Sequence, residues 1–210
     1  MTSTEGAVSN TATSGRLVFI LKKFHSLSGI VPIGAFLLEH LWTNAHVLGG
    51  AKSYDAAVQN IQDLPLLIFL EVFFIWLPIL YHGCYGLYVV FLGSSNLLRY
   101  PYQKNWLYWA QRVTGIIAFA FIIYHFWTMR VDKVTTFAGV TKELADAGNI
   151  TIYFIGLASV IFHFANGLWN FLIKWGVTTG SQSQRVSGFI FTLFGVLLFV
   201  VSIVSLFAFK

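Results

Sequence analysis

The chain has 210 residues, of which 57% are hydrophobic and 10% charged, and its mean hydropathy is +0.72. This composition excludes a soluble globular domain and indicates an integral membrane protein. The formal net charge is +5, but the basic residues form no stripe of the kind that binds nucleic acid. The single cysteine, Cys84, excludes an intramolecular disulfide and a cysteine-clustered metal site.

The N-terminal residues are small and polar and lack the apolar core of a signal peptide. We therefore expect residues 1–20 to form a flexible cytoplasmic tail, followed by one membrane domain over residues 21–210. A helix needs about 20 apolar residues to cross the hydrocarbon core, and the apolar runs here are continuous rather than alternating, which favours helices over a barrel. The sequence predicts an all-α protein with five transmembrane helices, over 24–46, 65–92, 107–129, 150–173 and 187–209.

The two longest connections between these spans are residues 47–64 and 130–149. Each contains a short amphipathic segment, "YDAAVQNIQ" and "VTKELADAG", which we expect to lie along the membrane surface.

The basic residues are distributed unevenly between the two sides of the predicted bundle. If the N-terminus is cytoplasmic, eight of them fall inside, against five outside, and the positive-inside rule favours this arrangement with the C-terminus outside. The inside set is Arg16, Lys22, Lys23, Arg99, Lys104, Arg112, Lys174 and Arg185, and the outside set is Lys52, Arg130, Lys133, Lys142 and Lys210.

Four of the five spans carry one histidine within an apolar run. Ionisable residues inside a membrane are costly and are candidates for function, although a single one can be a hydrogen-bonded packing residue. The fifth span, residues 187–209, has no histidine, and we expect it to serve packing alone. The four histidines are His40 in "LLEHLW", His82 in "ILYHGCYG", His125 in "IIYHFW" and His163 in "VIFHFANG".

Depth along the helices groups these histidines in pairs. His40 and His125 occur late in outward-running helices, whereas His82 and His163 lie about 15 Å from the cytoplasmic ends of inward-running helices. In an antiparallel bundle the first and third helices are diagonal, as are the second and fourth. The sequence therefore predicts that His40 faces His125 and that His82 faces His163.

Two facing imidazoles can supply both axial ligands of a haem iron. Zinc is the rival ligand, but a closed zinc site normally takes four protein ligands and each pair offers two. The four helices also contain small residues that would let a flat macrocycle approach, although close helix packing explains them equally well. These are Gly34, Gly83, Gly86, Gly115, Gly156 and Gly167.

Two haems at different depths would form an electron path across the membrane, as in a di-haem b-type cytochrome. The cytoplasmic loops "GSSNLLRYPYQKN" and "GVTTGSQSQRVS" are too short to make a catalytic domain. We therefore expect a separate soluble partner on that side and a lipid-soluble carrier such as quinone on the outer side.

Several long motifs resemble the five-helix, di-haem cytochrome b membrane anchor of succinate:quinone oxidoreductase. They include "KKFHSLSGIVPIGAFLLEH", "NWLYWAQRVTGIIAFAFIIYHFW" and "YFIGLASVIFHFANGLWNFLIKWGVT". The resemblance implies two haem b groups, a distal one bound by His40 and His125 and a proximal one bound by His82 and His163. It also implies a flavoprotein partner with FAD, an iron–sulfur partner, and reduction of quinone, expected to be menaquinone, near the distal haem.

Five further polar residues are candidates for supporting roles. His25, Gln111 and Arg112 lie at cytoplasmic helix ends, where they could contact a haem propionate. His25 could equally be an interfacial histidine, and Arg112, though favoured as a propionate contact, could instead be a topology anchor. Glu39 and Glu71 could exchange protons with quinone or could be structural acids. Some fumarate reductases carry an acid two positions before the fourth ligand; here that position is Ile161.

Two alternatives to a succinate dehydrogenase anchor stay open at this point. A quinol:fumarate reductase would use the same electron path in reverse. A transporter with histidine-based proton coupling would need broken helices, for which Pro32 and Pro78 are candidates.

Overall fold

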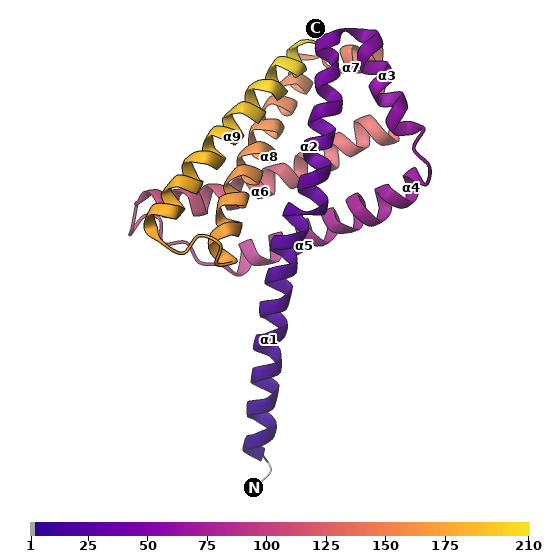
Figure 1. Cartoon of the computed structure of the whole chain (residues 1–210). Helices are drawn as coiled ribbons and strands as arrows, with labels where there is room; N and C mark the ends of the chain where they lie inside the picture. Colours follow the sequence, from indigo (N-terminus) through magenta and orange to yellow (C-terminus); the bar gives the residue numbers. More distant parts are fainter. Residues whose placement is uncertain (1–2) are drawn as a thin grey trace.

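The computed structural model describes the backbone of residues 3–210 and the side chains of residues 15–210. Over this range the chain forms helices and no strands (Figure 1), which confirms the predicted all-α membrane architecture. The tail predicted over residues 1–20 falls mostly outside the described side chains and stays a prediction. Five segments are long and apolar enough to cross a membrane: Gly15–Gly49, Leu67–Leu92, Gln103–Val131, Ala147–Lys174 and Ser181–Phe207.

The first span consists of α1 (Ser3–Ile30) and α2 (Pro32–Ala45), followed by the short 3-10 helix η1 (His46–Gly49). Pro32 has no N–H to donate to the preceding turn, so a bend is expected where the two helices join. The Val31 N–H still donates to the Leu27 carbonyl at 2.9 Å, and the Ala35 N–H donates to the Val31 carbonyl at 3.2 Å. The junction therefore bends the span without breaking it, and it does not provide the interrupted helix that a transporter would need.

The second and third spans each contain a π-helical turn. In the second, the turn η2 (Glu71–Trp76) lies between α4 (Leu67–Leu70) and α5 (Leu77–Leu92). Pro78 lies in the first turn of α5, two residues after η2 ends, and its ring and missing N–H disfavour regular α-helical bonding to the turn before it. In the third span α6 (Gln103–Phe126) ends in the turn η3 (Trp127–Val131).

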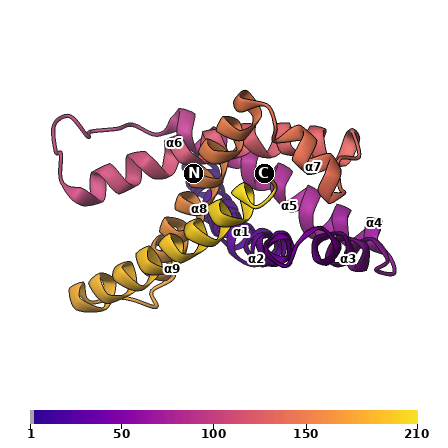
Figure 2. The same cartoon turned by 90° about the horizontal axis from the view of Figure 1, so that it is seen from above.

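The first four spans form a ring in which each packs against two neighbours. α1 packs against α5, α5 against α6, and α6 against α8 (Ala147–Lys174), which returns to α1. The first span is thus diagonal to α6, and α5 is diagonal to α8, as predicted. The histidine-free α9 (Ser181–Phe207) lies alongside α8 at one edge (Figure 2).

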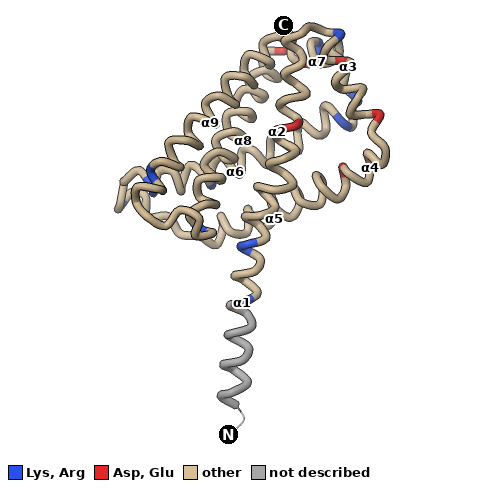
Figure 3. The backbone as a smooth tube through the Cα atoms, in the orientation of Figure 1, with Lys and Arg blue, Asp and Glu red and all other residues tan. Residues whose placement is uncertain are grey.

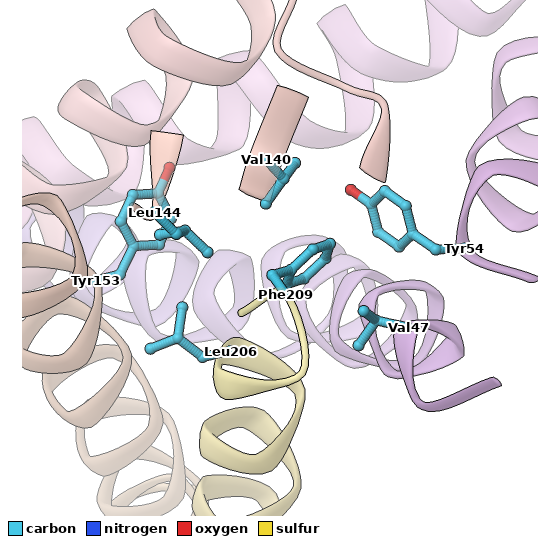
Figure 4. Close-up of a cluster of buried hydrophobic side chains, with 7 residues drawn as sticks. All are labelled: Val47, Tyr54, Val140, Leu144, Tyr153, Leu206 and Phe209. Carbon is cyan, nitrogen blue, oxygen red and sulfur yellow. The ribbon is translucent and has the colours of Figure 1, made fainter. Parts of the chain in front are cut away.

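The first predicted amphipathic segment lies within the surface helix α3 (Ala51–Gln62). The second, residues 140–148, overlaps the surface helix α7 (Phe137–Glu143) only over its first four residues and continues through a turn into α8. The Phe137 N–H donates to Asp55 Oδ1 at 2.7 Å, which ties α7 to α3. Side chains from η1, α3, α7, α8 and the C-terminal end of the chain form a buried group at these surface helices, which we name the cap cluster (Figure 4). It consists of Val47, Tyr54, Val140, Leu144, Tyr153, Leu206 and Phe209.

The cap cluster closes the end of the bundle where the C-terminus lies, and α1 projects from the opposite end (Figure 1). We call these the cap end and the tail end. An odd number of spans places the two termini on opposite sides of a membrane, in agreement with this arrangement. Many large apolar side chains along the spans are exposed on the outside of the bundle, for example Phe91 at 79% and Trp42 at 72%. Such a surface suits contact with lipid rather than with water.

Replacement of Leu144 by alanine is expected to destabilise the cap end. Leu144 is 1% exposed, and truncation of a fully buried leucine typically costs about 2–5 kcal/mol of unfolding free energy. The measurement is the thermal unfolding midpoint of the purified chain in detergent. Leu98→Ala is the matched control, because Leu98 is 98% exposed; equal midpoints for the two variants would contradict the assigned role of the cap cluster.

Candidate functional site: two histidine pairs in the bundle

The four span histidines meet in the two predicted pairs. His40 on α2 and His125 on α6 form the cap-side pair, with ring centroids 5.6 Å apart at an interplanar angle of 73°. His82 on α5 and His163 on α8 form the tail-side pair, with centroids 6.1 Å apart at 89°. Both pairs join diagonal helices, so each lies across the interior of the bundle.

The separation within each pair suits two ligands on opposite sides of one metal ion. An imidazole nitrogen bonds a transition metal at about 2 Å, so two rings facing each other across one ion have centroids about 6 Å apart. Among the described residues, no group of three or more histidine, cysteine or acidic side chains could hold a metal ion, and Cys84 is exposed. Each pair thus offers two ligands, the number that a haem iron takes axially and fewer than a closed zinc site takes.

Backbone carbonyls fix the rings of the tail-side pair. His82 Nδ1 lies 2.9 Å from the His25 carbonyl oxygen, and His163 Nδ1 lies 3.0 Å from the Gln111 carbonyl oxygen. Metal-bound histidines commonly donate their second ring N–H in this way, and the bond fixes both the tautomer and the ring orientation. It leaves Nε2 of each ring as the coordinating atom.

Side chains rather than carbonyls contact the cap-side pair. His125 Nδ1 lies 3.2 Å from the Tyr153 hydroxyl, and His40 Nε2 lies 3.4 Å from Asn44 Nδ2. The sequence analysis missed Tyr153 and Asn44, because the pattern gives no signal for a residue that supports a ligand from a neighbouring helix or turn.

Glycines make room for the tail-side rings. A Cβ on Gly115 would lie 2.8 Å from His163 Cε1, and a Cβ on Gly29 would collide with the His82 ring. Gly86 faces His25 Nε2, at 3.2 Å from its would-be Cβ. Other predicted glycines face phenylalanine rings instead, which is close packing: Gly34 faces Phe164, Gly83 faces Phe119 and Gly156 faces Phe121.

His25 is the polar candidate that the structure leaves incomplete. Its ring stacks on His82 with centroids 4.2 Å apart and an angle of 10°. Its Nε2 is buried and has no hydrogen-bond partner. A buried donor without a partner is costly, so an acceptor such as a haem propionate would complete this position.

Gln111 and Arg112 have partners within the chain. The Gln111 amide donates to the His163 carbonyl at 3.0 Å and accepts from Asn166 Nδ2 at 2.6 Å, so it braces α6 against α8. The Arg112 guanidinium lies 4.3 Å from the Tyr108 ring centroid and donates to the Gly93 carbonyl at 3.4 Å. Their predicted contacts with a propionate stay predictions.

The two span carboxylates differ in their surroundings. Glu39 is exposed on the bundle surface and accepts a hydrogen bond from Thr43, one turn along the same helix. Glu71, in η2, forms an ion pair with Arg130 in η3 at 2.9 Å, and its side chain is 19% exposed. This ion pair joins the two π-helical turns.

Two comparisons with known proteins give consistent matches. Residues 94–201 match the family described as "Succinate dehydrogenase/Fumarate reductase transmembrane subunit". The chain is also 38% identical over 200 residues to the succinate dehydrogenase cytochrome b558 subunit of Bacillus subtilis (strain 168), which covers 93% of this chain and 99% of that protein.

Replacement of Gly115 by alanine is expected to displace the His163 ring and reduce haem retention at the tail-side pair. The added methyl group would lie 2.8 Å from His163 Cε1, closer than real Cβ contacts allow. The haem content of the purified chain, measured by its visible spectrum, should fall by up to about half, since one of two pairs is affected. Gly180→Ala is the control, because a Cβ there lies 3.7 Å from Ser183 Oγ, an ordinary contact; equal haem content in both variants would contradict the prediction.

Proposed function

Because the chain belongs to the succinate dehydrogenase/fumarate reductase transmembrane subunit family, we propose that it carries electrons between a soluble redox partner and membrane quinone through two haem b groups. The observation that carries this proposal is the meeting of four span histidines in two pairs, 5.6 and 6.1 Å apart. When bound, haem supplies one-electron redox chemistry whose potential depends on axial ligands and nearby hydrogen bonds.

The chain's own residues would bind and orient the two groups. His82 and His163 would hold the proximal haem, with their Nδ1 atoms tied to carbonyl oxygens. His40 and His125 would hold the distal haem. The four pair histidines are half-buried between apolar helices, and His25 would offer its free Nε2 to a propionate of the proximal haem.

The tail end would face the cytoplasm and receive the partner subunits. Figure 3 shows basic residues at both ends of the bundle. The sequence assigns eight of the thirteen to the end from which α1 projects, as the positive-inside rule predicts for a cytoplasmic N-terminus. The described loops at this end, residues 93–102 and 175–180, are too short to form a catalytic domain. We propose that an iron–sulfur subunit docks here and receives electrons from a flavoprotein with FAD, and that the complex lies in a bacterial cytoplasmic membrane.

Quinone, proposed to be menaquinone, would react near the cap-side pair on the outer side. Glu71 is the favoured proton-exchanging group. It lies in the π-helical turn η2 and forms an ion pair with Arg130 in the π-helical turn η3. π-helical turns occur frequently at functional sites. Glu39 is less suited, because it faces away from the bundle interior and bonds within its own helix.

The direction of electron flow depends on the redox potentials of the bound groups and on the partner subunits, not on the arrangement of the histidine pairs. Quinol:fumarate reduction therefore uses the same residues in reverse, and the family description includes both activities. If the chain passes electrons from succinate to menaquinone, transfer toward the outer side would be assisted by the membrane potential, at about 2.3 kcal/mol per charge per 100 mV.

Substitution of single ligands tests the haem assignment. A reduced-minus-oxidised visible spectrum of the purified chain, titrated for potential, should show two b-type centres with different midpoints. His125→Ala should remove one centre and His163→Ala the other, because each substitution removes one of two axial ligands. A wild-type chain without haem, or one variant removing both centres while the other removes none, would contradict the proposal.

Substitution of Glu71 tests the quinone side. Glu71→Gln in the assembled complex should lower quinone reduction at least about tenfold, since positioned acid–base groups typically contribute factors of 10² or more. Both haem spectra and succinate-driven reduction of a soluble dye should be unchanged, which separates a local effect from misassembly. Glu39→Gln is the matched control and should retain turnover; full quinone activity in Glu71→Gln would remove Glu71 from the proton route.

A further inference from the structure

We infer that Tyr153 is a positioning residue for the cap-side pair: its hydroxyl oxygen accepts a hydrogen bond from the Nδ1–H of His125 and thereby sets the orientation of that ring and the redox potential of the iron that it would bind. The inference rests on the proposed function for the presence of haem. Its geometric basis is independent of any bound group.

Tyr153 is held firmly in place on α8. It is 6% exposed and belongs to the cap cluster, beside Leu144 and Leu206 (Figure 4). Its ring meets the Phe121 ring edge to face with centroids 5.4 Å apart, and the His125 ring with centroids 5.7 Å apart at 78°. The hydroxyl therefore has a fixed position relative to the imidazole.

The hydrogen-bond directions follow from the ligand role of His125. A neutral imidazole that offers Nε2 to a metal carries its proton on Nδ1, so the Tyr153 oxygen must accept at 3.2 Å. The Tyr153 hydroxyl can then donate to Thr128 Oγ1 at 3.3 Å. Thr128 in turn donates to the carbonyl of Tyr124 or of His125, each at 3.2 Å. Each donor in this series of hydrogen bonds has an acceptor, and the last hydrogen bond is accepted by a carbonyl of α6, the helix that bears His125.

This support differs in kind from that of the tail-side pair. There, backbone carbonyl oxygens accept from His82 and His163, so no side-chain substitution removes the acceptor directly. At His125 the acceptor is a side-chain oxygen, and replacement of tyrosine by phenylalanine deletes it while keeping the ring that packs against Phe121.

The electronic consequence has a definite sign. A hydrogen bond from Nδ1–H raises the basicity of the ligand, and a more electron-donating imidazole favours the oxidised iron. Loss of the acceptor therefore favours the reduced iron. We expect the midpoint potential of the cap-side centre to rise and that of the tail-side centre to stay constant.

The test is a potentiometric titration of Tyr153→Phe in the assembled complex, followed by visible and electron paramagnetic resonance spectra. At a fixed potential, the ratio of reduced to oxidised cap-side centre should increase about threefold to tenfold, where tenfold corresponds to about 59 mV for one electron. Tyr124→Phe is the matched control. The Tyr124 hydroxyl bonds Asn149 and Glu143 rather than a histidine, so both midpoints should match the wild type.

Two haems with unchanged midpoints in Tyr153→Phe would overturn the inference. If that variant fails to retain the cap-side haem, Thr128→Val decides the matter, because it removes the next link and leaves Tyr153 in place. A rise of the cap-side midpoint in Thr128→Val supports the inference, and two unchanged midpoints overturn it. Absence of two b-type centres from the wild type would instead refute the proposed function, so the two failures are distinguishable.

Discussion

The ring N–H groups of His82 and His163 need acceptors inside the membrane bundle, and this need organises the tail-side half of the protein interior. Lipid offers no water to satisfy a stray donor. The acceptors for His82 and His163 are carbonyls of residues that lie on the neighbouring helices α1 and α6. Each such bond therefore fixes a ring and, at the same time, the position of one helix against the next.

The same bonds join two of the four helix pairs that are neighbours in the four-span ring, α1 with α5 and α6 with α8. α1 lies next to α5 because His25 both accepts from His82 and stacks on it. α6 lies next to α8 because Gln111 bonds His163 with its carbonyl oxygen and its amide, while Asn166 returns a bond to the same amide. α9 takes no part in these contacts and adds apolar surface against α8. Ligand orientation and helix packing are thus the same set of contacts.

The features that could be predicted from the sequence are those that depend on one physical constraint. Membrane thickness determines span length, and antiparallel crossing determines which histidines share a depth, so both the five spans and the two pairs were predictable. The π-helical turns and the Glu71–Arg130 ion pair could not be predicted. The two residues of the ion pair are 59 positions apart in the sequence, and their contact depends on how the second and third spans pack. Gly29 was missed for a similar reason: its neighbour is the His82 ring on another helix.

The positions of the cap-cluster residues in the sequence determine the order in which two parts of the bundle can form during membrane insertion. Its members extend from Val47, at the end of the first span, to Phe209, one residue before the C-terminus. The cap end therefore cannot close until the fifth helix has inserted. Both histidine pairs, by contrast, are complete once α8 has entered the membrane. The two histidine pairs can accordingly meet before the cap closes, and the last helix then covers the end of a bundle whose pairs are already formed.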